Sequence, residues 1–345
     1  MADRTQARRL PSACKGDRDV NEADARRSLD YTSATRGLAP IPAAERDLPT
    51  AIAEPYFKVA EGQVALEGPA FDREGNLLFV DIYGGRILRL SPDRQLSVVH
   101  AENDLHPAGI AVHRDGRIFV ASVGTVDSTG HFHNGSVIAL DPDGRNRRTI
   151  VPPEAGYVVD DLVFDNEGGI YFTDFRGGST DPKGGVYYVT PDFASVRPVL
   201  PRMCAANGVA LSPDGKVLWA TEYCLNRLHR IELASPGVVM RHGGTVPYHF
   251  IGRAPDSMRT DSAGNVHVAM NYQGRILVFS PYGMPIGQIV LPGRDKDLWL
   301  KSTSLALKPD SHELFIVSRD VIGGNGAMIF SARGPAPGFR MFSHQ

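Results

Sequence analysis

The sequence predicts an all-β protein, a six-bladed β-propeller with a metal site on its central axis. Three observations predict this fold: one motif recurs six times, each copy alternates apolar and polar residues about a tight turn, and turn-forming residues are frequent. The chain has 345 residues, of which 36 are Gly and 25 are Pro. This abundance indicates many turns rather than long helices.

The recurring motif is an apolar stretch, a turn of the Asp-x-x-Gly or Pro-Asp-Gly type, and a second apolar stretch. Its period-2 alternation predicts two strands joined as a hairpin. A third stretch such as GGRILRL follows in most copies, and a weaker fourth such as GQIVLPG follows in several. Four short strands repeated six times are typical of a propeller, whereas paired β-sandwiches do not repeat one motif. The turn position is occupied by Gly75, Gly116, Gly168, Gly215, Gly264 and Ser311.

The segment before the first repeat differs in composition from the rest of the chain. Residues 1–45 alternate charged and small polar residues and end in a proline-rich stretch. We therefore predict a flexible N-terminal arm over residues 1–45 and the propeller over residues 46–345. A propeller closes its ring by pairing strands from its two ends, because an open ring would leave two unpaired edges. Segments 55–60 and 338–345 are the candidates for that pair.

Charge and composition argue against several classes of protein. The formal net charge is −2 at pH 7, so no basic surplus favours nucleic-acid binding. No apolar run is long enough for a membrane span, and the N-terminus lacks an apolar leader, so we expect a cytoplasmic protein that is a monomer or a weak homo-oligomer. Cys14, Cys204 and Cys224 are too few for a disulfide framework. The favoured interpretation of Cys204 and Cys224 is two buried thiols, with a bond between them as the alternative.

One residue of each copy lies eight positions before the turn, where the innermost strand of each blade is expected to begin, and four of these six residues have acidic or amide side chains. Because the blades share one axis, the oxygen-bearing members of this set should converge, and three carboxylates would repel one another unless a cation lies between them. No His or Cys belongs to the set, so its oxygen atoms favour Ca²⁺ first and Mg²⁺ or Mn²⁺ next. The alternative is that these side chains cap strands beside channel water. The set consists of Glu67, Ala108, Asp160, Asn207, Asp256 and Thr303.

Two further residues follow predicted channel-facing strands. Arg176 and Tyr223 could line a substrate pocket or could be ordinary loop residues, and the sequence favours neither interpretation. The chain contains no G-x-S-x-G elbow, no H-E-x-x-H, no Walker loop and no Rossmann fingerprint.

Four runs carry a resemblance to a known family: EGPAFDREGNLLFVDI, DDLVFDNEGGIYFTDFRG, ANGVALSPDGKVLWATE and PDSMRTDSAGNVHVA. They resemble the senescence-marker-protein/gluconolactonase/luciferin-regenerating family, and most closely its branch of bacterial drug-responsive lactonases. The resemblance implies a catalytic Ca²⁺-like metal ion held by Glu67, Asp160, Asn207 and Asp256, with Ser257 as a further ligand. It also assigns the role of proton donor to Asp256.

The same resemblance implies a second, structural calcium ion. Its expected neighbours are Ser128 and Gly130, with Tyr157 as a backbone ligand. This chain reads VPPEAGY where the family supplies further ligands, so proline and alanine stand at two ligand positions.

The activity implied by the resemblance is that of a Ca²⁺-dependent lactonase. Such an enzyme hydrolyses the ester bond of a small-molecule lactone, with the metal polarising the carbonyl group and Asp256 shuttling the proton. Mg²⁺, Mn²⁺ or Zn²⁺ are the substitutes for Ca²⁺. The alternatives are a phosphotriesterase-like or sugar-lactone hydrolase on the same site, and a non-catalytic calcium-binding propeller.

Overall fold

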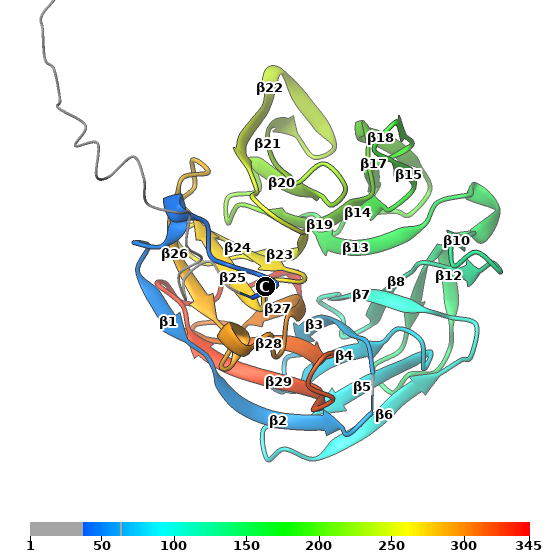
Figure 1. Cartoon of the computed structure of the whole chain (residues 1–345). Coiled ribbons are helices and arrows are strands. Elements are labelled where there is room, and N and C mark those ends of the chain that lie inside the picture. Colours follow the sequence, from blue (N-terminus) through cyan, green and yellow to red (C-terminus); the bar gives the residue numbers. More distant parts are fainter. Residues whose placement is uncertain (1–36, 63) are drawn as a thin grey trace, which may run out of the picture. The chain divides into compact units, whose positions relative to one another are not determined.

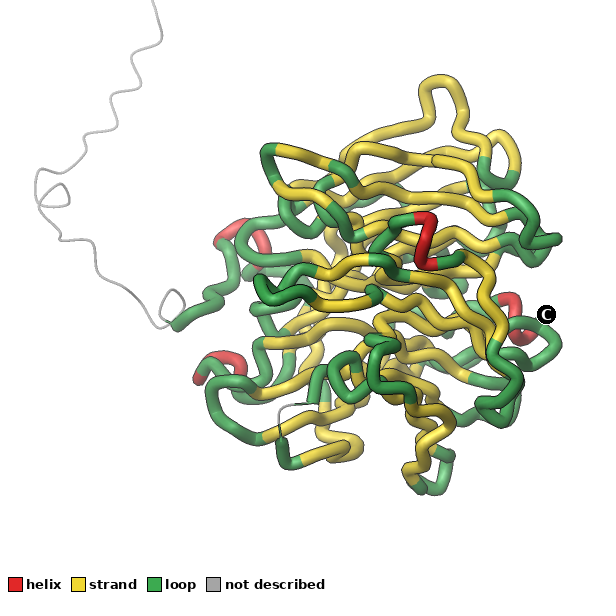
Figure 2. Tube along the Cα trace, turned by 90° about the vertical axis from the view of Figure 1, so that its right-hand side faces the viewer, coloured by secondary structure: helices red, strands yellow, loops and turns green. Residues whose placement is uncertain are grey.

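Six sheets of four or five strands form the body of the protein (Figure 1). The structure is a computed structural model and describes residues 37–345 apart from residue 63. The described residues lie mainly in strands and loops, and the helices are short (Figure 2). They are the 3-10 turns η1 (Ala43–Glu45), η2 (Pro153–Ala155), η3 (Arg294–Lys296) and η4 (Phe342–His344). In this described part of the chain, no helix is long and apolar enough to cross a membrane.

The first three blades follow one another along the chain, each written here from its innermost strand outward. Blade 1 consists of β3 (Leu66–Phe71), β4 (Leu77–Asp81), β5 (Arg86–Leu90) and β6 (Leu96–Ala101). Blade 2 consists of β7 (Pro107–Val112), β8 (Ile118–Ser122), β11 (Ser136–Leu140) and β12 (Arg148–Val151), with a small hairpin of β9 (Thr125–Val126) and β10 (Phe132–His133). Blade 3 consists of β13 (Val159–Phe164), β14 (Ile170–Asp174), β17 (Gly184–Val189) and β18 (Val196–Met203), with a hairpin of β15 (Gly177–Gly178) and β16 (Asp181–Pro182).

The last three blades have the same order of strands, and two of them recruit N-terminal strands. Blade 4 consists of β19 (Ala206–Leu211), β20 (Val217–Glu222), β21 (Arg227–Ser235) and β22 (Val238–His249). Blade 5 consists of β23 (Pro255–Thr260), β24 (Val266–Met270), β25 (Arg275–Phe279), β26 (Pro285–Val290) and the parallel strand β1 (Thr50–Ile52). Blade 6 consists of β27 (Lys301–Leu307), β28 (Glu313–Asp320), β29 (Gly326–Arg333) and β2 (Glu54–Ala60).

The innermost strands contact one another in a closed ring. Their order is β3, β7, β13, β19, β23 and β27, and β27 contacts β3 again. Six apolar clusters each join two neighbouring blades. In one of them Phe119 of β8 packs with Phe172 of β14, and both side chains are fully buried. The predicted six-bladed β-propeller is therefore confirmed.

The turn that defined the repeat has the expected backbone. The five glycines at this position have φ angles between 68° and 93°, a region that favours glycine. In the sixth copy Ser311 replaces glycine, and the positive φ moves to Asp310, at 58°. Asp and Asn tolerate this conformation better than other non-glycine residues, so the sixth hairpin keeps its turn.

The ring closes through an N-terminal strand, as predicted for residues 55–60, but with a different partner. Strand β2 pairs antiparallel with β29 at the outer edge of blade 6. The predicted partner, residues 338–345, forms no strand, so that half of the prediction is wrong. The edge of β29 is already satisfied by β2 and leaves no place for a further strand.

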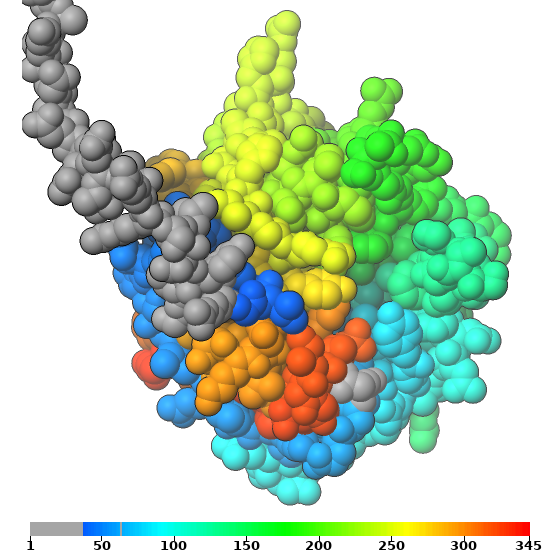
Figure 3. Space-filling view, viewed as in Figure 1, coloured from blue at the N-terminus to red at the C-terminus, as the bar shows by residue number. Residues whose placement is uncertain are grey.

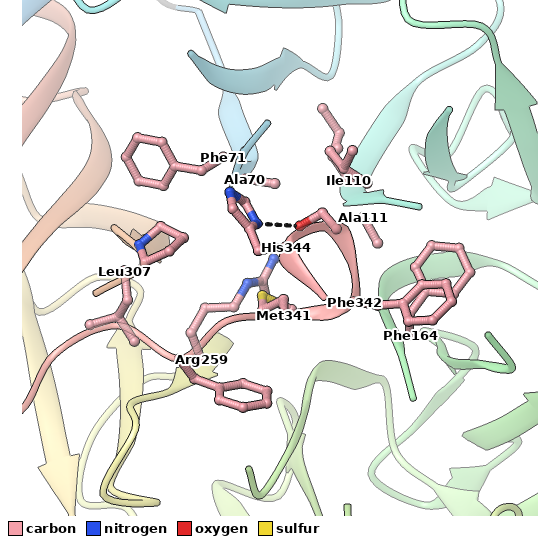
Figure 4. A pocket seen from close by; sticks show the side chains of 14 residues that line it. Ala70, Phe71, Ile110, Ala111, Phe164, Arg259, Leu307, Met341, Phe342 and His344 are labelled. Carbon is pink, nitrogen blue, oxygen red and sulfur yellow. Dashed lines mark hydrogen bonds between the residues drawn. The ribbon is translucent and has the colours of Figure 1, made fainter. Parts of the chain in front are cut away.

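The C-terminal residues instead cover one end of the ring of inner strands (Figure 4). Phe342 is 3% exposed, and its ring centroid lies 5.3 Å from that of Phe164 on β13. Between this tail and the inner strands lies a cavity of about 30 Å³ that is also lined by Arg259 of β23. The tail thus leaves the opposite end of the ring as the place for a ligand.

The predicted arm falls only partly within the described residues. Residues 1–36 lie outside them, and for these residues the arm stays a prediction. Residues 37–45 are described, and Glu45 at the end of η1 is 1% exposed. Its Oε2 lies 2.5 Å from Nη2 of the fully buried Arg275, and Tyr248 Oη donates to its Oε1 at 2.5 Å. The last residues of the predicted arm are therefore anchored on blade 5.

Candidate metal centre and active site

Each innermost strand carries a bulge at the same level of the ring. A bulge inserts an extra residue, bends the strand and changes the direction of its side chains. Here it follows or includes the residue that lies eight positions before the turn. The shifts in register fall between Glu67 and Ala70, Pro107 and Gly109, Val159 and Leu162, Ala206 and Val209, Pro255 and Met258, and Ser302 and Ser304.

The bulges bring neighbouring blades into backbone contact. A Cβ atom on Gly68 would lie 2.8 Å from Gly109 Cα, and one on Gly208 would lie 2.7 Å from Asp256 O. Real Cβ atoms do not approach other atoms so closely. Glycine at these two positions therefore allows the close approach of adjacent inner strands.

Three carboxylates from blades 1, 3 and 5 interact at this level. Burial raises the pKa of Glu67 well above its usual range, and the charges of Asp256 and Asp160 raise it further. Burial likewise raises the pKa of Asp160, with Asp256 and Asp161 adding to the effect. Burial raises the pKa of Asp256 to about 7, although hydrogen bonds from Asn271 and Asn207 oppose the rise. The site therefore resists carrying three negative charges without a cation.

Amide groups complete the site, and two of their oxygen atoms have no partner. Asn271 Nδ2 donates to Asp256 Oδ2 at 2.7 Å, and the amide of Asn207 also bonds Asp256. Asn207 Oδ1 and Asn271 Oδ1 are buried without a hydrogen-bond partner. A buried oxygen without a hydrogen-bond partner costs about 1–3 kcal/mol of folding free energy. A bound cation or hydrogen-bond donor that contacts these oxygens would recover that cost. Ser257 is 2% exposed beside them.

The chemistry of these donors fits a hard divalent cation. Carboxylate and amide oxygens are the ligands that such cations prefer, and the mutual repulsion of Glu67, Asp160 and Asp256 would be relieved by one. Among residues 37–62 and 64–345, no three His, Cys, Asp or Glu side chains form a ready-made ligand cluster. The fit therefore depends on the unpaired Asn207 oxygen and the raised carboxylate pKa values, and the ligand assignments stay predictions.

A fourth acid, Asp161, has its own counterion. Arg259 Nη1 donates to Asp161 Oδ2 at 2.9 Å, and Nη2 lies 3.4 Å from Oδ1. Both side chains are buried, at 5% exposure for Arg259 and 1% for Asp161. The backbone amides of Leu162 and Val209 also donate to Asp161. Arg259 also lines the cavity under the C-terminal tail, so this buried ion pair lies between that end of the ring and the level of Glu67, Asp160 and Asp256.

The two predicted pocket residues have different surroundings. Tyr223 lies close to the site, since its pKa is raised by burial first and then by the charge of Asp256. Its ring is 5.5 Å from that of Phe175. Arg176 is instead held by the fully buried Asp174, at 2.7 Å, and its guanidinium group lies over the Tyr157 ring. Only Tyr223 is thus connected to the carboxylates, and the pocket role of both residues stays a prediction.

The predicted second calcium site also stays a prediction. Ser128 and Gly130 lie in the exposed turn between β9 and β10, where Gly130 N donates to Asp127 O at 3.0 Å. The carbonyl oxygen of Tyr157 accepts a hydrogen bond of 2.6 Å from Gly135 N. These hydrogen bonds join residues of the loops to one another, and they do not identify an ion-binding site.

The cysteines described by the structure are free thiols. Cys204 is buried, as predicted, but Cys224 is exposed, so the prediction of two buried thiols is wrong for Cys224. Burial raises the pKa of the Cys204 thiol to about 12, with Cys224 as the next cause. Cys14 lies outside the described residues.

Comparison with known proteins identifies the family. The model of the SMP-30/Gluconolactonase/LRE-like region matches residues 66–320. The chain belongs to the SMP-30/gluconolactonase/LRE-like family. Within it, the chain is 44% identical over 318 residues to "Lactonase drp35" of Staphylococcus saprophyticus, covering 91% of this chain and 97% of that protein. It is 43% identical over 322 residues to "Lactonase drp35" of Staphylococcus aureus strain MW2, covering 92% and 98%.

Solved structures of the family agree in fold. A luciferin-regenerating enzyme matches with a TM-score of 0.68 and 19% identity, over 85% of this chain and 99% of that chain. The calcium-binding protein regucalcin of Agrobacterium tumefaciens matches with a TM-score of 0.67 and 18% identity, over the same shares. At this identity the likeness concerns the fold, and the expected family and propeller are both confirmed.

Two residues near the site were missed by sequence reasoning. Arg259 could have been found, because it lies three positions after Asp256. The corresponding positions of the other repeats hold only small or apolar residues: Ala70, Ala111, Val163, Ala210 and Ala306. Asn271 had no such signal, since it follows the second strand of its blade and reaches Asp256 only through the fold of that hairpin.

Proposed function

We propose that this member of the SMP-30/gluconolactonase/LRE-like family is a metal-dependent lactonase, which hydrolyses the ester bond of a lactone to give a hydroxy acid. The observation that carries the proposal is the group of three mutually repelling carboxylates beside the unpaired Asn207 oxygen at one level of the ring. Relatives named "Lactonase drp35", at 42–44% identity, support the reaction class.

The residues that would hold the cation are Glu67, Asp160, Asn207 and Asp256, with Ser257 as a further ligand. Ca²⁺ is the first choice for this set of oxygen donors, and Mg²⁺, Mn²⁺ or Zn²⁺ would be substitutes. When bound, the cation supplies Lewis-acid polarisation of the lactone carbonyl group.

Asp256 carries out the proton transfer. Its Oδ2 is held by Asn271 Nδ2 at 2.7 Å, which fixes the orientation of the carboxylate. Asp256 accepts a proton from water as the water oxygen bonds to the carbonyl carbon. It then returns that proton to the ring oxygen as the ester C–O bond breaks, so the ring opens with no net change at Asp256.

The experiment is a panel of aromatic, aliphatic and sugar lactones with an organophosphate triester, assayed in EDTA and after Ca²⁺, Mn²⁺ or Zn²⁺ is restored. We expect lactone turnover that EDTA abolishes and Ca²⁺ restores. Asp256→Asn should lose about 10²–10⁴-fold in kcat while calorimetry still detects bound Ca²⁺. Full recovery of Asp256→Asn at saturating Ca²⁺ would show that Asp256 is only a ligand.

The alternatives correspond to other outcomes of the same panel. Preferred turnover of the triester would indicate a phosphotriesterase-like enzyme, and turnover confined to sugar lactones would indicate a sugar-lactone hydrolase. Ca²⁺ binding without any turnover would indicate a non-catalytic calcium-binding propeller. The regucalcin neighbour, described as a calcium-binding protein, keeps this last alternative in the test.

The remaining parts of the proposal concern the setting of the enzyme. We propose a small-molecule lactone as its partner, a cytoplasmic location, and a monomer or weak homo-oligomer as its state. The arm predicted over residues 1–45 stays a prediction for residues 1–36, which lie outside the described residues. Size-exclusion chromatography with light scattering tests the oligomeric state, and deletion of residues 1–36 tests the arm.

A further inference from the structure

A large cavity lies beside the site, between blades 5 and 6 and the N-terminal segment. Its volume is about 570 Å³. One part of its wall is apolar and includes Leu38, Pro40, Ile251 and Ile322. Figure 3 shows the N-terminal segment, in blue, against the yellow and orange surfaces of blades 5 and 6. The cavity can therefore accommodate a substituent of substrate size.

The other part of the wall is cationic. Lys301 Nζ lies 3.1 Å from the centroid of the Tyr272 ring, and the Arg253 guanidinium group lies 4.6 Å from the same centroid. A hydrogen bond with Lys301 is the largest cause that lowers the pKa of Tyr272, and the charges of Arg253 and Arg319 add to it. Lys301 and Arg253 thus both contact one tyrosine ring, and Arg319 is a further cation nearby.

These cations have no anionic partner in the described part of the chain. Neither Arg253, Lys301 nor Arg319 has an Asp or Glu oxygen within 4.0 Å there, and Arg319 Nε is buried without a hydrogen-bond partner. By contrast, the buried Arg259 and Arg275 are each paired with a carboxylate. Asp297 also lines the cavity, but its carboxylate accepts a hydrogen bond from Leu38 N and pairs with neither Arg253 nor Lys301. Two cations of the wall without a carboxylate partner favour the binding of an anion.

The backbone connects this cationic wall to the catalytic site. Lys301 forms an isolated β-bridge with Asn271, whose side chain donates to Asp256. Burial lowers the pKa of Lys301, whereas its hydrogen bond with Tyr272 and, to a smaller extent, the charge of Asp256 raise it. Next to Asn271, Tyr272 has a φ of 67°, a strained value for an aromatic residue. Such strain persists where the surrounding structure holds a side chain in a required position.

We propose that this cavity selects amphiphilic anionic lactones: a carboxylate or similar anionic oxygen group beside the lactone ring pairs with Arg253 and Lys301, and an apolar chain packs against Leu38 and Ile251. The inference rests on the proposed lactonase function and adds its substrate class. Arg253 and Lys301 act as specificity residues in it, and Tyr272 positions their charges.

The test uses three probe lactones that differ in one feature each: a γ-lactone with a ring carboxylate and a hexyl chain, its methyl ester, and its short-chain acid. We expect the native enzyme, full chain with Ca²⁺, to prefer the acid over the methyl ester by about tenfold in kcat/KM, as a charge-assisted hydrogen bond gives. The preference should arise mainly in KM and should fall as ionic strength rises.

Lys301→Gln should remove most of this preference for the acid. The matched control is Lys308→Gln in the same blade, whose ammonium group is exposed and paired with Glu313 at 2.8 Å, and it should leave both rates unchanged. Leu38→Ser should reduce the preference for the hexyl chain over the short chain.

An equal loss of kcat/KM on the acid and on the methyl ester in Lys301→Gln would overturn the inference, because Lys301 would then act only through its charge on Asp256. A native enzyme that prefers the neutral ester would overturn it as well. Failure of the proposed function is a different result, since no lactone would then be hydrolysed at all, whatever its charge.

Discussion

The metal-free protein should lose stability as the pH rises, and Asp256 allows the loss to be calculated. Its pKa is raised from 3.8 to about 7 in the folded state, chiefly by burial. Between these two values the folded state binds more protons than the unfolded state. The free energy of unfolding therefore falls as pH rises, and the stabilisation by the proton on Asp256 is lost as the pH passes through about 7.

The size of the effect follows from the two pKa values. For values of 3.8 and about 7, protonation of Asp256 contributes roughly 3 kcal/mol at pH 5 and close to zero at pH 8. The raised pKa values of Glu67 and Asp160 act in the same direction. Saturating Ca²⁺ should cancel the loss, because a bound cation stabilises the charged carboxylates that the metal-free protein disfavours.

The assay is urea unfolding in EDTA at pH 5, 6, 7 and 8 for the native protein and for Asp256→Asn. Asparagine has nearly the shape of aspartate and does not titrate. Groups that do not sense the charge of Asp256 therefore cancel in the difference between the two curves, which reports Asp256 together with its effect on Glu67 and Asp160. We expect that difference to change by about 3 kcal/mol from pH 5 to pH 8. Parallel curves would refute the reasoning, since Asp256 would then titrate alike in the folded and unfolded states.

Three other predictions follow from contacts in the structure. Glu67→Gln removes one of the three carboxylate charges, so calorimetry should show that the affinity for Ca²⁺ is reduced by at least about tenfold. The circular dichroism spectrum should stay unchanged. An undiminished affinity would mean that Glu67 is not a ligand. Glu45→Ala leaves the fully buried Arg275 without its counterion and should lower the free energy of unfolding by about 3–5 kcal/mol. Deletion of residues 1–36 should lower it by almost nothing. Equal losses in the two variants would show that Glu45 is not the anchor. Phe342→Ala opens the covered end of the ring and should cost about 3–5 kcal/mol in urea unfolding, and a loss below about 1 kcal/mol would mean that the tail does not seal it.

The sequence predicted the ring and the level of the site because both depend on local pattern. A turn residue and a period of two are visible in each repeat, and a constant offset of eight residues marks the same place in all six blades. The bulges that turn these residues toward the axis occur at that offset in every blade. Glu67, Asp160, Asn207 and Asp256 are therefore brought to one level by the repeat itself.

Contacts between distant segments could not be predicted in the same way. Residues 338–345 have an apolar alternation that suits a strand, yet β2 occupies the edge of β29. The anchor of Glu45 requires a buried arginine 230 positions away in sequence. The cationic wall gathers Arg253 from a loop and Lys301 from β27, and no spacing in the sequence connects them.

The adjacent acids Asp160 and Asp161 show how the fold separates two residues that the sequence makes equivalent. Asp161 receives two bonds from Arg259 and further bonds from the amides of Leu162 and Val209. In the described part of the chain Asp160 has no such donor, and the charges that reach it are those of Asp256 and Asp161, which raise its pKa. Arg259 thus forms an ion pair with Asp161, whereas Asp160 has no such counterion among the described residues. Because the uncompensated acid is the one at the level of Glu67 and Asp256, a cation bound there gains the charge of Asp160 without competing with Arg259.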